Sequence, residues 1–116
     1  MNALVDTNIL VRLQDTDHPI SIICRGALRG AVRRGDVLYL CAQSTIEFWS
    51  VATRPRNVNG LGLTSEEAEA GLKDAEQWMF WLPEPPDVGK RWRNLVNHYN
   101  VLGKQAHDVR LVALSL

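Results

Sequence analysis

The chain has 116 residues, 46% of them hydrophobic, which suffices for one domain with a core and is too short for two. Its 13 basic and 13 acidic side chains cancel, so no overall field favours or excludes a nucleic-acid or membrane partner. An acid interrupts the first apolar stretch and no apolar run reaches the ~20 residues of a membrane span, so neither a secretory signal nor an anchor is expected. Cys24 and Cys41 lack the spacing of a metal site and are expected to be reduced. We therefore predict one cytoplasmic domain over residues 1–116.

Capping residues and apolar spacing predict strands that alternate with helices. The run 37–41 is continuous and β-rich, which is typical of a strand buried on both faces of a parallel sheet. Ser44 with Glu47, and Thr64 with Glu67, have the spacing of a capping box. In chain order the predicted elements are a strand ending at Leu4-Val5, a helix from Thr7-Asn8 toward Leu13, a helix from Pro19 to Gly35, the strand 37–41, a helix from Ser44 to Pro55, a helix from Thr64 to about Gln77, a strand over 78–82, a helix capped by Asp87 and a last helix from about Lys104 to Leu116.

This alternation predicts an α/β sandwich with a parallel sheet and right-handed crossovers. Open parallel sheets carry ligand chemistry at the carboxyl ends of their strands, and Asp6 follows the first strand at such an end. An aspartate after a strand is also a common turn residue and helix cap. Asp6 alone therefore leaves both interpretations open.

Two further acids lie at the starts of helices. Glu47 follows the second strand, where its simpler role is to partner Ser44 in a capping box. Asp108 precedes Val109 and Val112 at a spacing that places it on the inward stripe of the last helix, where a buried carboxylate costs several kcal/mol unless a cation meets it. Acids clustered at ~5 Å would repel by roughly 3 kcal/mol per pair at a dielectric constant of ~20, so a cluster requires a counter-charge such as Mg²⁺ or Mn²⁺. The pattern favours metal-dependent hydrolysis of a phosphodiester.

Three segments in the same order and spacing, residues 4–10, 44–47 with the following Arg54-Pro55, and 103–113, together resemble the PIN domain. More narrowly, they resemble VapC-type toxins of prokaryotic toxin–antitoxin pairs, from residue 2 to the last residue. The resemblance implies a three-layer α/β/α Rossmann-like sandwich and a Mg²⁺- or Mn²⁺-dependent ribonuclease that is commonly a homodimer. It also implies cleavage of RNA that leaves 5′-phosphate and 3′-hydroxyl ends, and a cognate antitoxin protein that blocks the acidic cleft.

The same resemblance assigns roles to individual residues. Asp6 and Asp108 would hold the metal, and Glu47 would complete the acidic cluster directly or through water. Thr7 and Asn8 would orient the cluster by hydrogen bonds. Asp6, Glu47 and Asp108 are therefore the predicted catalytic and metal-binding residues, and Thr7 and Asn8 are predicted to support them.

Other polar and aromatic residues receive simpler interpretations. Ser44 supports the site as the capping partner of Glu47. Arg54 and Arg56 follow the Glu47 helix and are candidates for contacts with RNA phosphates, with a plain surface role as the alternative. The remaining basic residues at helical spacing are predicted to form a solvated face, and the tryptophans to fill core positions: Arg25, Arg29, Arg33 and Arg34, and Trp49, Trp78, Trp81 and Trp92.

Members of the resembled family continue past the helix that carries Asp108 into two more strands, whereas this chain ends at Leu116. We therefore expect a sandwich that lacks its last strands, with an unpaired edge on the first strand that favours self-association through that edge or the final helix. Two functions stay open. One is a VapC-like, metal-dependent endoribonuclease, and the other is a catalytically inactive remnant that binds an antitoxin or assembles with itself.

Overall fold

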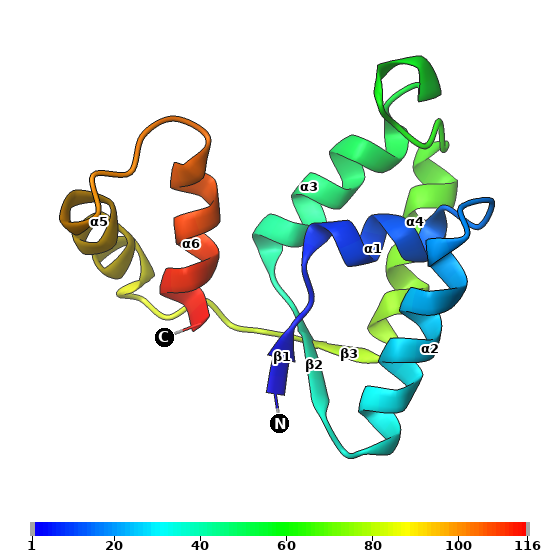
Figure 1. Cartoon of the computed structure of the whole chain (residues 1–116), viewed down its shortest axis with the longest axis horizontal. Helices are drawn as coiled ribbons and strands as arrows, with labels where there is room; N and C mark the ends of the chain where they lie inside the picture. The colour runs from blue at the N-terminus through cyan, green and yellow to red at the C-terminus, as the bar shows by residue number, and fades with distance from the viewer. Residues whose placement is uncertain (1, 116) are drawn as a thin grey trace. The chain divides into compact units, whose positions relative to one another are not determined.

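The computed structural model describes residues 2–115, with the side chains up to Leu114. The chain forms two compact units, Met1–Leu82 and Pro83–Leu116. Each unit has its own elements, labelled in Figure 1. None of the described helices is long and apolar enough to cross a bilayer.

The first unit alternates strands and helices. Its elements are β1 (Asn2–Leu4), α1 (Thr7–Gln14), α2 (Ile20–Arg33), β2 (Val37–Leu40), α3 (Ala42–Thr53), the 3₁₀ helix η1 (Arg56–Val58), α4 (Ser65–Glu76) and β3 (Met79–Trp81). The three strands form a parallel sheet in the order β1-β2-β3, with Ala3 opposite Leu38 and Tyr39 opposite Phe80. The predicted α/β fold with a parallel sheet flanked by helices is confirmed. Among the described strands, β1 pairs with β2 alone, so its other edge has no strand partner there.

Helices α1 and α3 begin at the carboxyl ends of β1 and β2, at the same end of the sheet (Figure 1). Each helix buries one face, with inward side chains at helical spacing. Phe48 on α3 and Leu10 on α1 are almost completely buried, and so is Leu40 on β2. This core fixes the two helix starts against the sheet, and it therefore fixes the residues that follow the two strands.

The two predicted capping boxes have different outcomes. Thr64 and Glu67 form a reciprocal capping box at the start of α4, as predicted. The box predicted for Ser44 with Glu47 is wrong, because α3 begins earlier, at Ala42, and Cys41 is its N-cap. The Cys41 sulfur accepts a hydrogen bond from the Ser44 backbone N–H. The Glu47 side chain is therefore not used in a cap and turns to another partner.

The second unit contains α5 (Val88–His98) and α6 (Gln105–Ser115). The Trp92 indole N–H donates to the Ala106 carbonyl oxygen at 2.8 Å, which fixes how α6 is rotated against α5. Ala106 and Val109 are half-buried on the same face of α6, whereas Asp108 is exposed. The prediction that Asp108 lies on the inward stripe is wrong, because that stripe runs through Ala106 and Val109 and leaves Asp108 on the exposed side of the helix.

The predicted core positions of the tryptophans are also wrong in part. Trp49 and Trp92 are half-buried, whereas Trp78 and Trp81 are exposed. Trp81 ends β3, which is an edge of the described sheet and has no strand on its outer side there, and Trp78 lies in the turn before this strand.

Candidate active site

Asp6 lies just beyond the carboxyl end of β1 and is the N-cap residue of α1. Its backbone carbonyl oxygen accepts hydrogen bonds from the N–H groups of Ile9 and Leu10. Its carboxylate makes no capping hydrogen bond, although aspartate is one of the residues best suited to that role. Asp6 is exposed and so does not lie on a core-facing position, and Asn8 is the second residue of the helix, not its cap. The Asp6 carboxylate therefore faces solvent without a structural task in the cap.

Glu47 lies in the second turn of α3, and both of its carboxylate oxygens accept hydrogen bonds. The Thr7 hydroxyl donates to Oε2 at 2.8 Å, and the Gln43 amide donates to Oε1 at 3.1 Å. Thr7 and Gln43 are buried, with exposed fractions of 9% and 7%, whereas Glu47 is half-buried. Two neutral donors therefore hold the carboxylate in one orientation without neutralising its charge.

The Thr7–Glu47 hydrogen bond joins the starts of α1 and α3 across 40 residues of sequence. Because Thr7 directly follows Asp6, it brings the Glu47 carboxylate to the segment that carries Asp6. The Thr7 hydroxyl therefore contacts the Glu47 carboxylate, and its role in a metal site stays a prediction. Gln43 was missed by the sequence analysis, although its position four residues before Glu47 is a spacing at which helical side chains meet.

The carboxylate oxygens of Asp6 and Glu47 are ligands that suit a hard divalent cation. A carboxylate has about four lone-pair positions, so Glu47 keeps acceptor capacity beyond its two hydrogen bonds. Mg²⁺ and Mn²⁺ prefer oxygen ligands, and Mg²⁺ is usually bound through one or two carboxylates with several waters retained. Within residues 2–115 no group of three or more His, Cys, Asp or Glu side chains is drawn together around a metal position. The first unit supplies two acids of the predicted set, Asp6 and Glu47.

Asp108 belongs to the second unit, in the first turn of α6 as predicted. Its exposure removes the argument that a buried carboxylate needs a cation there. The assignment of Asp108 to the metal set rests on the motif that it shares with the resembled family. It stays a prediction.

The two supporting residues Asn8 and Ser44 lie in contrasting surroundings. Asn8 is exposed on the first turn of α1. Ser44 is completely buried, and its hydroxyl lies 3.2 Å from the Cys41 sulfur. Ser44 therefore stabilises the start of α3 rather than pairing with Glu47 in a capping box.

A tightly hydrogen-bonded loop follows α3 and carries the two arginines predicted to meet RNA. Arg56 is exposed, and the half-buried Arg54 donates to the Ser50 hydroxyl at 3.2 Å. The loop returns to its own start, with the Gly60 N–H bonded to the Pro55 carbonyl oxygen at 3.0 Å. These contacts give the loop a fixed shape, and the RNA-binding role of its arginines stays a prediction.

A groove of about 350 Å³ lies between α1 and this loop. Its lining includes Thr7, Asn8 and Arg12 of α1 and Asn59 and Gly60 of the loop. Neither Asp6 nor Glu47 lines this groove, but Thr7, whose hydroxyl donates to Glu47, does. We call it the Asn59 groove.

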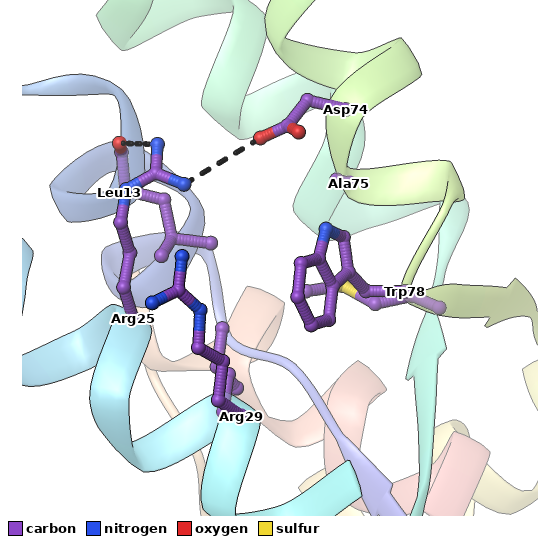
Figure 2. Close-up of a pocket in the computed structure, with 8 residues that line it drawn as sticks. Leu13, Arg25, Arg29, Asp74, Ala75 and Trp78 are labelled. Atoms are coloured by element: carbon purple, nitrogen blue, oxygen red, sulfur yellow. Dashed lines mark hydrogen bonds and ion pairs between the residues drawn. The ribbon is translucent and has the colours of Figure 1, made fainter.

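A second, much smaller cavity of about 20 Å³ has room for about one water molecule and is lined by neither Asp6 nor Glu47. Figure 2 shows Arg25 and Arg29 of α2 on one side of it and Trp78 on the other. Arg25 donates to the Leu13 carbonyl oxygen at 2.7 Å and lies 3.7 Å from the Asp74 carboxylate (Figure 2). The prediction of a purely solvated face is wrong for Arg25, which connects the last turn of α1 to α4.

Comparison with known proteins gives one family. The profile of the PIN domain matches residues 3–115, nearly the whole chain. No curated protein matches the sequence significantly.

Proposed function

Since this chain belongs to the PIN domain family, a nuclease fold, we propose that it is a divalent-metal-dependent endoribonuclease resembling VapC-type toxins. The observation that carries the proposal is the Thr7–Glu47 hydrogen bond beside Asp6, at the carboxyl ends of two parallel strands. Ligand chemistry in open α/β sheets is found at this end. A Glu47 carboxylate held by two hydrogen bonds is a feature expected of a site prepared for a ligand. So is an Asp6 carboxylate that makes no capping hydrogen bond, although Asp6 is the N-cap residue of α1.

In this proposal, which follows the resemblance to the family, Asp6 and Asp108 would hold Mg²⁺ or Mn²⁺, and Glu47 would contribute directly or through water. When bound, the ion supplies a Lewis acid that offsets the negative charge developing on the phosphodiester. Thr7 and Gln43 hold the Glu47 carboxylate in place, so little reorganisation is needed on binding. Water attacks the phosphorus and the bond to the 3′ oxygen breaks, which leaves a 5′-phosphate and a 3′-hydroxyl.

The test is titration of the purified chain with Mn²⁺ by calorimetry, beside cleavage of single-stranded RNA with Mg²⁺ or with EDTA. Asp6→Asn and Asp108→Asn should each abolish metal-dependent cleavage and weaken Mn²⁺ binding while the fold persists by circular dichroism. Asp17→Asn is a matched control, because Asp17 is an exposed acid in the loop after α1. A folded chain that neither binds Mn²⁺ nor cleaves RNA would contradict the proposal and favour the alternative of an inactive, partner-binding module.

The proposed partners, besides RNA, are a second copy of the chain and a cognate antitoxin protein. Support comes from apolar side chains on α2, where Ile22 and Ile23 are 78% and 68% exposed. Contiguous exposed apolar residues are typical of interaction surfaces. Light scattering of the wild-type chain and of Ile22→Lys tests this proposal, and a wild-type chain that is monomeric at all concentrations would contradict the homodimer.

A further inference from the structure

The Asn59 groove combines polar amides with an apolar floor. Asn8 and Asn59 line it with their amide side chains, and Val11, Val51 and Leu61 supply apolar surface. No hydrogen bond links the side chain of Asn8 or Asn59 to another residue in the described part of the chain. The amides are therefore available to a ligand, and each offers both a donor and an acceptor.

The charge in the groove is nearly balanced. Arg12 is its cation, and the Arg12 guanidinium lies 3.7 Å from the carboxylate of Asp15, which also lines the groove. A site that captured phosphate alone would present unpaired positive charge. Amides beside apolar surface instead match a nucleobase, which has a flat apolar face and donors and acceptors along its edge.

The groove is also held in shape before any ligand arrives. A Cβ added at Gly60 would lie 1.9 Å from the Arg54 carbonyl oxygen, so the loop backbone closes on itself more tightly than any side chain allows. Asn59 has a φ of 63°, in the left-handed region that asparagine tolerates better than most residues. This backbone presents the Asn59 amide at the groove without a loop rearrangement, which limits the entropic cost of binding.

From these observations we propose that the Asn59 groove binds one unpaired base of the RNA substrate, next to the scissile phosphate. Its volume of about 350 Å³ falls in the range of small-molecule sites. Thr7 lines the groove and also donates to Glu47, so this residue links a nucleotide bound in the groove to the proposed acidic site. The inference rests on the proposed nuclease function and adds to it a subsite that reads one unpaired base of the substrate.

The binding test uses the four ribonucleoside 5′-monophosphates as probes, titrated in EDTA and followed by the backbone amide signals of the full chain. The signals of Asn8, Gly60 and Leu61 should shift with at least one of the four nucleotides. Asn59→Gly keeps a backbone that glycine adopts freely and removes the amide, so affinity should fall by about three- to tenfold, the value of one net hydrogen bond. Asn100→Gly is the matched control, since Asn100 also has a positive φ, 53°, and lies in the second unit.

The outcomes separate this inference from the nuclease proposal. Equal affinities for Asn59→Gly and Asn100→Gly, or an absence of shifts at the groove with all four nucleotides, would overturn it. In the cleavage assay Asn59→Gly should raise KM for single-stranded RNA and leave kcat nearly unchanged. Groove binding in EDTA without any cleavage in Mg²⁺ or Mn²⁺ would support the base site and contradict the nuclease. Cleavage that is identical in the two glycine variants would contradict the base site alone.

Discussion

The hydrogen bond between Thr7 and Glu47 is the contact on which the site depends, and its energy can be measured. Thr7→Val removes the hydroxyl with little change in shape, and Glu47→Ala removes the acceptor. A hydrogen bond to a charged group contributes about 1.5–3 kcal/mol net when buried. Because Glu47 is half-buried and keeps some contact with water, we expect about 1 kcal/mol.

A double-mutant cycle isolates this energy. The free energies of unfolding of the wild-type chain, Thr7→Val, Glu47→Ala and the double variant are measured by urea denaturation. With a slope near 1.5 kcal/mol per M, a coupling of about 1 kcal/mol corresponds to a midpoint difference of roughly 0.7 M. Thr7→Ser, which keeps the hydroxyl, should retain most of the coupling.

Thr53 offers a matched control for the cycle. Its hydroxyl donates to the Trp49 carbonyl oxygen at 2.8 Å, so Thr53→Val removes a hydrogen bond that does not involve Glu47. The coupling between Thr53→Val and Glu47→Ala should lie within the additivity error of about 0.3–0.5 kcal/mol. A coupling that small for Thr7 with Glu47 would refute the reasoning that Thr7 holds the carboxylate.

Three further predictions follow from the packing and the caps. Gly60→Ala places a methyl group 1.9 Å from the Arg54 carbonyl oxygen and should lower the free energy of unfolding by about 1–3 kcal/mol. Gly26→Ala, a helical position with open space around it, should be neutral or stabilising, and equal urea midpoints for the two variants would contradict the prediction. Phe48→Ala, at a side chain that is 1% exposed, should cost about 3–5 kcal/mol by urea denaturation, and a loss below about 1 kcal/mol would show that the core is not packed as described. The hydrogen bonds from the backbone and hydroxyl of Thr64 lower the pKa of Glu67 below its usual value, so this stabilisation is present above the unfolded-state pKa of about 4.3 and is lost as pH falls through the lower folded-state pKa. Carbon NMR titration checks the sign, because Thr64→Ala should raise the pKa of Glu67.

Local signals in the sequence determined the order of the elements. Gly35, with a φ of 86°, ends α2 as predicted, and the Thr64 capping box starts α4. The run 37–41 contains the central strand of the described sheet. Each of these signals acts through hydrogen bonds or backbone angles within a few residues, so neighbouring amino acids are enough to specify it. The sequence likewise placed Asp6 at the end of a strand.

Only the tertiary structure decided which way the functional side chains face. Ser44 with Glu47 has the spacing of a capping box, but packing of α3 places Cys41 at the cap and leaves Glu47 to Thr7. The inward spacing of Asp108 was equally misleading, because the contact of Trp92 with the start of α6 sets the rotation of that helix. Helical periodicity gives the angle between two residues but not the rotation of the helix about its axis. That rotation depends on contacts between residues far apart in the chain, which no local pattern encodes.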